Sequence, residues 1–410
     1  MRSLLVLYFL ISLGTVRAGT IVVDQRGPVR SLRQAVNMAK RADTILLHRG
    51  LYREGNIVVT KSISIIGVDG PVLDGENKHE LLTLSGKNII VSGIHFINAG
   101  YSSMNDFAAI KVIDASRILI ENNTLTNTSF AIHISNSTLS VVRNNTITGN
   151  NKSEHLSGNG IHLWKCDGMM IDNNRIRGHR DGIYLEFVTG STIQRNKSER
   201  NVRYGLHFMF SHSDRYLFNT FENNGAGVAV MYSKNVHMEY NLFDKNWGAS
   251  AYGILLKDIS NSQILNNRFI QNTVAIHMEG SSRIEIGRNT FKSNGWALKV
   301  QASCDDNNFF QNNFFANSFD VATNGSVTLN KFYNNYWDKY DGYDMDRDGY
   351  GDVPYHPVSM YAMLVEQNPT TLMLMRSFMV SLLDKAEKAI PSLTPENLVD
   401  GKPVLKPNKL

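Results

Sequence analysis

This sequence has little cysteine, and the two cysteines it has stand far apart. Cys166 and Cys304 are separated by six units of the repeat described below. Stacked strands lie ~4.8 Å apart, so the two residues would be roughly 29 Å apart. A disulfide requires Cα atoms within about 7 Å. We therefore expect two separate thiols, each packed as a structural residue.

Long hydrophobic runs are also missing. A membrane-spanning helix needs about 20 consecutive apolar residues, and no run in this sequence is that long. The apolar run 4–13 follows Arg2 and precedes small residues at the Ala18–Gly19 junction. This arrangement predicts a secretory signal peptide over residues 1–18, with an uncleaved anchor as the alternative. The mature chain would then begin at Gly19 and act outside the cytoplasm.

No charge of one sign dominates the chain. It contains 42 Lys and Arg against 37 Asp and Glu, for a net charge of +5. Loss of Arg2 and Arg17 with the signal leaves 40 basic residues and a net charge of +3. Such a balance lacks the basic footprint of a nucleic-acid-binding protein, so no nucleic-acid partner is expected.

What the sequence does contain is an asparagine repeat. It returns about every 22 residues, at Asn123, Asn145, Asn174, Asn196, Asn219, Asn241, Asn267, Asn289, Asn313 and Asn335. A second marker runs in step with it, a small residue followed by alternating apolar residues, as in Gly160-Ile161-His162-Leu163. A unit this short with period-two alternation predicts a solenoid of short strands, a parallel β-helix. The asparagines would stack as a ladder at a tight turn.

The repeat also predicts the domain organisation. We expect an all-β fold, a right-handed parallel β-helix of about twelve coils over residues 19–340. Ser31 can cap a helix over Leu32–Lys40 that covers the first coil. Residues 341–368 form an acidic, glycine-containing segment, and residues 369–410 an apolar helical tail with an extended end.

Alternation also predicts which side chains face outward. Because neighbours in a strand point to opposite faces, the apolar set faces inward and two outward columns result. One contains His133, His162, Tyr184 and His207; the other contains Trp164, Glu186, Met209 and Met231. His207, Met209 and Met231 should therefore converge, and imidazole with thioethers suits Cu(I). We predict a copper site there with His212 as a fourth ligand; packing under a partner or a loop is the alternative.

A second metal site is indicated after the repeat ends. Asp344, Asp346, Asp348 and Gly349 match the first half of a calcium-binding loop, and Asp352 stands at its ninth position. The twelfth position is Tyr355, where such loops carry a bidentate Glu. We expect either a Ca²⁺ site or a hydrogen-bonded acidic turn.

Two regions are candidates for partner binding. An insertion in the repeat carries Trp247 and Tyr252. The tail segment 372–383 is almost entirely apolar but too short to span a bilayer, and it includes Leu372, Met373, Met375, Phe378, Met379 and Leu382. It either docks on a partner or caps the last coil. Under the docking interpretation, truncation at Pro369 should leave the β-helix folded.

Polysaccharide lyases and hydrolases also use β-helices, and they need paired carboxylates in a cleft. The acidic candidates are Asp181 and the pair Asp305-Asp306, and the outward columns near that pair offer no further acid. We therefore favour a non-enzymatic protein and keep a polysaccharide-binding or polysaccharide-cleaving protein as the alternative.

Several segments resemble the NosD family, the periplasmic maturation proteins of nitrous-oxide reductase. They are the Met-bearing repeats 205–211 and 227–233, the run Asn335-Tyr336-Trp337-Asp338, and residues 344–354. The resemblance spans nearly the whole mature chain. It implies copper delivery to the apo-reductase for assembly of its copper–sulfide centre. It also implies action with an ABC-transporter permease and its cytoplasmic ATPase, and receipt of copper from a periplasmic donor protein. The protein would be periplasmic, held at the inner membrane through the permease.

Overall fold

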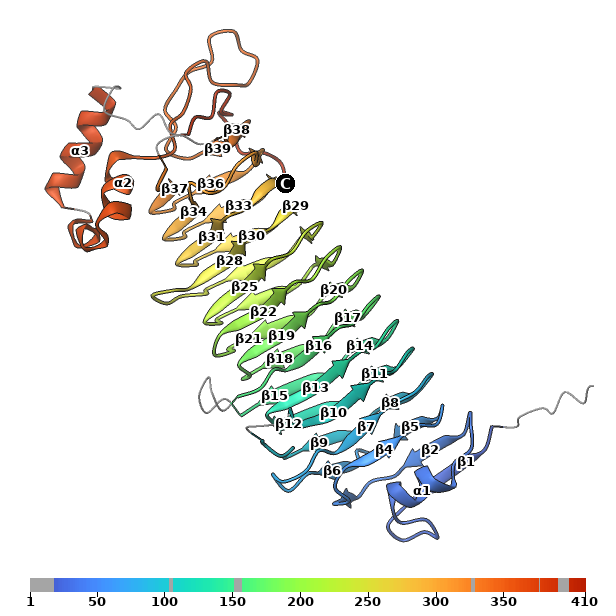
Figure 1. Cartoon of the computed structure of the whole chain (residues 1–410). Helices are drawn as coiled ribbons and strands as arrows, with labels where there is room; N and C mark the ends of the chain where they lie inside the picture. Colours follow the sequence, from blue (N-terminus) through green and yellow to red (C-terminus); the bar gives the residue numbers. More distant parts are fainter. Residues whose placement is uncertain (1–17, 103–105, 151–156, 326–328, 376, 390–397) are drawn as a thin grey trace, which may run out of the picture.

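The chain folds as one elongated solenoid, seen from the side in Figure 1. This computed structural model describes residues 18–102, 106–150, 157–325, 329–375, 377–389 and 398–410. The predicted signal peptide therefore lies almost entirely outside the described residues. Within them, parallel strands form three sheets of 14, 13 and 12 strands, here called sheets A, B and C. The predicted parallel β-helix of about twelve coils is confirmed.

The strands are short, as the repeat length requires. Sheet A contains β1 (Thr20–Val23), β2 (Thr44–Leu47), β5 (Ser64–Gly67), β8 (Ile90–Ser92), β11 (Leu119–Glu121), β14 (Val141–Arg143), β17 (Met170–Asp172), β20 (Thr192–Gln194), β23 (Arg215–Leu217), β26 (His237–Glu239), β29 (Ser260–Leu265), β32 (Ser282–Gly287), β35 (Asn308–Phe310) and β38 (Lys331–Tyr333). Sheet B contains β3 (Leu51–Tyr52), β6 (Val72–Asp74), β9 (His95–Ile97), β12 (Thr124–Thr128), β15 (Thr146–Gly149), β18 (Arg175–Arg177), β21 (Lys197–Glu199), β24 (Thr220–Glu222), β27 (Leu242–Asp244), β30 (Arg268–Ile270), β33 (Thr290–Lys292), β36 (Asn313–Phe315) and β39 (Tyr336–Trp337). Sheet C contains β4 (Ile57–Val59), β7 (Leu82–Leu84), β10 (Ala108–Ile113), β13 (Phe130–Ser135), β16 (Ile161–Trp164), β19 (Asp181–Glu186), β22 (Tyr204–Met209), β25 (Ala226–Met231), β28 (Tyr252–Lys257), β31 (Val274–Glu279), β34 (Trp296–Val300) and β37 (Phe319–Ala322).

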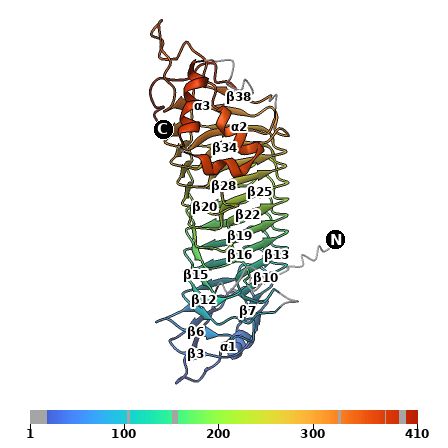
Figure 2. The same ribbon diagram turned by 90° about the vertical axis from the view of Figure 1, so that its left-hand side faces the viewer.

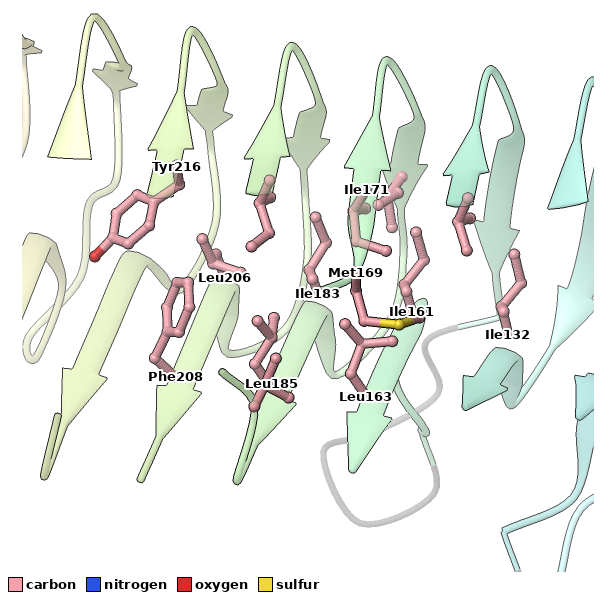
Figure 3. Packing of buried hydrophobic residues seen from close by; sticks show 14 of the residues in the cluster. Ile132, Ile161, Leu163, Met169, Ile171, Ile183, Leu185, Leu206, Phe208 and Tyr216 are labelled. Carbon is pink, nitrogen blue, oxygen red and sulfur yellow. The ribbon is translucent and has the colours of Figure 1, made fainter. Parts of the chain in front are cut away.

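The core is a stack of identical layers along the solenoid axis. Inward residues of sheet C pair in register from coil to coil, as Ile132 with Ile161 and Ile161 with Ile183, all fully buried. Figure 3 shows these side chains filling the space between the sheets, with Met169 among them. Met169 and Met238 are both buried. Burial of matching apolar side chains in every coil holds the register, since a one-residue slip would expose them.

Buried asparagine ladders stabilise the turns. From Asn123 to Asn289, the backbone N–H and the side-chain N–H of each ladder asparagine both donate to the side-chain amide oxygen of the next. Asn123, for example, donates to Oδ1 of Asn145 at 3.0 and 3.1 Å. The ninth rung is Asn312 rather than the predicted Asn313, which instead binds Asn408 at 2.8 and 2.9 Å. A second ladder, not predicted, links Asn201, Asn224, Asn246, Asn272, Asn294 and Asn317.

A helix covers the N-terminal end of the solenoid, as expected. Helix α1 (Leu32–Met38) ends two residues before the predicted boundary, and the Ser31 side chain caps it by accepting from the Gln34 N–H. Glu54 of the adjacent coil accepts hydrogen bonds from the N–H groups of Leu32 and Arg33, at 2.8 and 2.9 Å. The carboxylate thereby satisfies free donors at the positive end of the helix and ties it to the solenoid.

The C-terminal tail lies beside sheet C rather than over the last coil (Figure 2). It contains α2 (Met360–Gln367), the 3₁₀ helix η2 (Pro369–Leu374) and α3 (Phe378–Ala389). Tyr361, Ala362 and Val365 of α2 share a small hydrophobic cluster with Trp296 and Phe319 of sheet C. None of the described helices is both long and apolar enough to cross a membrane.

The last coil is covered by residues 398–404 near the end of the chain, so the alternative in which residues 372–383 cap it does not hold. Asp400 is fully buried and pairs with Phe332, while Val404 pairs with Tyr336. The structure argues against the expectation that the β-helix stays folded without the residues after Pro369. Truncation there would expose the edge that residues 398–404 protect.

Candidate metal-binding face on sheet C

Sheet C carries the two predicted outward columns in the predicted register. His133, His162, Tyr184 and His207 are consecutive pairing partners on β13, β16, β19 and β22. In the second column, Glu186 pairs with Met209 and Met209 with Met231. Period-two alternation and in-register stacking are enough to produce both columns.

The first column is not exposed, which corrects one premise of the copper prediction. His207 points away from the core, yet only 4% of it is accessible. Its ring stacks on Tyr184, with centroids 4.7 Å apart, and lies 5.0 Å from the ring of Tyr204. Tyr184 covers the ring of His207 from the adjacent coil, and Tyr204 covers it from the same strand. Outward-facing side chains of stacked coils can therefore bury one another.

His207 belongs to a charged network that the sequence did not reveal. Arg203 donates to both carboxylate oxygens of Asp181, at 2.9 and 2.6 Å, and to Nδ1 of His207 at 3.2 Å. Burial raises the pKa of Asp181, but hydrogen bonds from His207 and Arg203 outweigh it and hold that pKa below its usual range. Nε2 of His207 is buried and has no hydrogen-bond partner in the described part of the chain.

Met209 and Met231 lie side by side on adjacent strands and are half-buried. The Tyr184 hydroxyl contacts the Met209 sulfur at 3.9 Å. Beyond the two methionines, the chain turns at Phe210 and Tyr232, whose left-handed φ values are 51° and 53°. These two rings stack with centroids 5.0 Å apart, so an apolar corner borders the thioether pair.

The structure does not place His212 on this face. It lies past the Phe210 corner, between β22 and β23, and its Nδ1 accepts the backbone N–H of Lys234 at 3.3 Å. His207, Met209 and Met231 are thus brought together by strand register, while the corner turns His212 toward sheet A.

The first column also holds a cluster that the sequence analysis did not identify. Asp106, His133 and His162 each offer one ligand atom, and these atoms lie within 4.8 Å of one another. Burial lowers the pKa of His133, and it lowers the pKa of His162 to about 3. The placement of His133 and His162 in one column, 29 residues apart, could have indicated this cluster from the sequence. Asp106 could not be placed in the same way, because it lies before strand β10, where alternation predicts no side-chain direction.

The acidic segment forms a tight loop. Asp344 accepts the backbone N–H groups of Arg347 and Gly349, at 2.6 and 2.9 Å, and Gly349 has a φ of 92°. Carboxylate oxygens of Asp344, Asp346 and Asp348 lie within 4.8 Å of one another. Asp352 is engaged elsewhere, because it accepts the N–H of Met345 at 2.6 Å.

The predicted partner residues divide into exposed and packed ones. Trp247 is 55% exposed, whereas Tyr252 packs on His277 with ring centroids 5.0 Å apart. In the tail, Met375 packs against the α2 cluster. Met373 and Phe378 are 89% and 82% exposed, and Leu372, Met379 and Leu382 are also exposed.

The two cysteines are free and buried, as expected. Burial raises the pKa of Cys166 to about 11 and also raises the pKa of Cys304. A thiol that stays protonated is a poor metal ligand and nucleophile. These residues are therefore packing groups of the solenoid and stand apart from the sheet C face.

Comparison with known proteins identifies a periplasmic copper-binding family and a β-helix fold. Residues 151–342 match the family described as "Periplasmic copper-binding protein (NosD)", and residues 81–215 match "Right handed beta helix region". The chain is 29% identical over 380 residues to the "Probable ABC transporter binding protein NosD" of Pseudomonas aeruginosa, covering 86% of each chain. It is 26% identical over 374 residues to the protein of that name in Stutzerimonas stutzeri, covering 86% of this chain and 85% of that one.

Among solved structures, the chain is similar to the catalytic unit of an α-1,3-glucanase from Streptomyces thermodiastaticus. The TM-score is 0.61 at 12% identity, over 79% of this chain and 67% of that one, which is a likeness of fold alone. The match to the NosD model includes the methionine-bearing coils, and the similarity to the two relatives extends along most of the chain. The chain is a right-handed β-helix protein, and its similarity to NosD proteins over 86% of its length, with a match of residues 151–342 to the NosD model, supports its identification as NosD-like.

Proposed function

We propose that this protein is a non-enzymatic maturation factor that handles Cu(I) in the periplasm and helps assemble the copper–sulfide centre of nitrous-oxide reductase. The observation that carries the proposal is the pairing of Met209 with Met231 on adjacent strands, beside His207. Thioethers are soft ligands that favour Cu(I) over the harder divalent ions. Half-burial of the pair leaves room for a donor and an acceptor protein to reach the ion.

His207 can complete this site through its free Nε2. In the tautomer protonated at Nδ1, where Nδ1 faces an Asp181 oxygen 3.8 Å away instead of accepting from Arg203, the Nε2 lone pair is free to act as a ligand. A carboxylate behind a ligating imidazole orients the ring and raises its basicity. Arg203 balances the charge of Asp181, so the network behind the ligand stays neutral. His212 is outside this set.

The tail provides a surface for the transporter. Relatives from two organisms carry the name "ABC transporter binding protein", and the exposed apolar face of η2 and α3 is of the kind that binds another protein. We propose that Met373, Phe378, Met379 and Leu382 dock on the permease, whose ATPase lies in the cytoplasm. The protein would thereby be held at the inner membrane. Trp247 would contact the apo-reductase or the periplasmic copper donor.

A polysaccharide-cleaving function is less well supported. Asp181, one of the acidic candidates, has a side chain with 0% exposure and a bidentate ion pair with Arg203. A general acid must reach its substrate and exchange protons with it, which this carboxylate cannot do in its paired, buried state. Asp305 and Asp306 are exposed; Asp305 pairs with Ser282 in an isolated β-bridge, and Asp306 lies in a bend.

The test is co-purification followed by reconstitution. The tagged protein should capture the permease and the apo-reductase, and Cu(I)-loaded protein should restore the absorption spectrum of the copper–sulfide centre in a cell lacking the native gene. Release of reducing or unsaturated sugar ends from acidic or neutral polysaccharides, with no effect on the reductase, would instead establish the enzymatic alternative.

A further inference from the structure

We propose that Asp106, His133 and His162 form a second metal site, which binds a divalent first-row ion and binds Cu²⁺ most tightly. The site uses none of the residues of the proposed Cu(I) site, so it stands or fails on its own. It lies on the same outward column of sheet C, two coils away from His207.

The backbone brings the three ligands together. His133 on β13 and His162 on β16 are direct pairing partners, and their rings meet edge to face with centroids 4.8 Å apart. Asp106 immediately precedes the neighbouring strand β10, and its carboxylate lies 3.8 Å from Nε2 of His133. Three ligand atoms within 4.8 Å of one another surround a space of the size that one ion occupies.

The hydrogen bonding of these histidines is incomplete. Among the residues that the structure describes, both ring nitrogens of His162 and Nδ1 of His133 are buried without a hydrogen-bond partner. Other buried histidines differ, since His179, His207 and His277 each have one nitrogen hydrogen-bonded. Buried polar atoms in folded proteins almost always have partners. A metal ion would satisfy nitrogens that the described protein groups leave free.

The surroundings favour neutral imidazoles and a cation between them. Phe130 forms an apolar wall, with its ring 5.8 Å from that of His162 and 6.0 Å from that of His133. The nearest cation in the column, Lys111, is neutralised by Glu80 at 2.8 Å. Asp106 is 55% exposed at the side chain, so the ion has a path from solvent past its carboxylate.

The donor set decides the class of metal. Two imidazoles with one carboxylate suit Cu²⁺, Zn²⁺, Ni²⁺ and Fe²⁺, and the order of stability among divalent ions places Cu²⁺ highest. Met209 and Met231, in contrast, favour Cu(I). One face of sheet C would then carry two sites of opposite preference, separated along the column by the ring of Tyr184.

The experiment is a Cu²⁺ titration of the whole mature protein, followed by electron paramagnetic resonance. The first equivalent should give a signal with hyperfine coupling to two nitrogens. His133→Gln/His162→Gln should abolish that signal, and Asp106→Asn, which is exposed and cannot disturb the core, should weaken binding roughly 10-fold or more against a glycine competitor. His277→Gln, a buried histidine of the same column, is the matched control and should change neither.

The Cu(I) site and the Cu²⁺ site can be tested independently of each other. Met209→Ala/Met231→Ala should leave the Cu²⁺ signal intact while removing Cu(I) binding. If the two-nitrogen signal survives in folded His133→Gln/His162→Gln protein, or if Asp106→Asn binds Cu²⁺ as tightly as the unmodified protein, the second site does not exist as proposed.

Discussion

Asp400 accepts both the backbone and the side-chain N–H of Asn335, at 3.1 and 2.9 Å, and so continues the asparagine ladder beyond its last rung. The same oxygen accepts the indole N–H of Trp337 at 3.0 Å. The segment after the helical tail therefore completes the solenoid, which would otherwise end with three unsatisfied buried donors.

Asp400→Ala should consequently destabilise the β-helix. Leaving buried donors without a partner costs about 1–3 kcal/mol each, so we expect a loss of at least about 2 kcal/mol. Chemical unfolding followed by circular dichroism measures it. Asp305→Ala, which truncates an exposed side chain, is the control and should have little effect. Equal stability of the two variants would mean that the end of the solenoid needs no cap.

The copper proposal predicts the behaviour of the methionine pair. Met209→Ala/Met231→Ala should lower Cu(I) affinity at least 10-fold in competition with a chromophoric chelator, because both soft ligands are removed. Met170→Ala, which removes a 40% exposed methionine on sheet A, is the matched control. Unchanged Cu(I) affinity in the double variant would place the site elsewhere, with the tail methionines as the next candidates.

The docking proposal is best tested by substitution, since truncation removes the cap. Met373→Glu/Phe378→Glu should abolish binding to the permease by placing charge in an apolar contact. The thermal midpoint should not change, because both side chains are more than 80% exposed. Val58→Glu, an exposed strand position near the other end, should bind normally. Permease binding by the double variant would contradict the proposal.

Asp214 should make stability depend on pH. Burial raises its pKa to about 8, and one of its oxygens has no hydrogen-bond partner among the described residues. The folded state therefore holds a proton that the unfolded chain releases near pH 4. The free energy of unfolding should fall as pH rises from about 4 to about 8, by at most on the order of 5 kcal/mol.

Asp214→Asn should remove this part of the pH dependence while keeping an acceptor for the Ser191 N–H. Unfolding free energies at pH 5 and pH 8 test it, with Asp305→Asn as the control. The proposal is wrong if the variant and the unmodified protein show the same difference between the two pH values.

We also propose that Asp344, Asp346 and Asp348 bind Ca²⁺ weakly. The twelfth loop position is occupied by Tyr355, whose ring packs on Trp337, so the usual bidentate carboxylate is missing. We expect a dissociation constant of roughly 10⁻⁴–10⁻³ M. Calorimetric titration with CaCl₂ should show binding that Asp344→Asn/Asp348→Asn abolishes and that Asp69→Asn, in a remote turn, retains. No heat of binding in the unmodified protein would leave the segment as a hydrogen-bonded turn.

The architecture and the outward columns could be predicted from the sequence because they depend on local periodicity. Alternation decides which face of a strand a residue takes, and a constant repeat length places equivalent residues in register. This is why the pairing of Met209 with Met231 was predictable. The same reasoning placed the ninth rung at Asn313 instead of Asn312, since adjacent asparagines carry the same signal and only hydrogen bonding separates them.

Three features could be seen only in the tertiary structure. They are the burial of outward-facing side chains, the direction that the chain takes at its corners, and the return of the C-terminal segment to the last coil. Stacked rings from neighbouring coils bury His207, although it points outward. The left-handed residue Phe210 turns His212 away from the methionines. Asp106 reaches His133, and Asp400 reaches Asn335 from 65 residues away. Period-two alternation therefore determined the columns of this solenoid, while contacts between segments without periodicity determined which residues are covered, which are charged and which come together as a site.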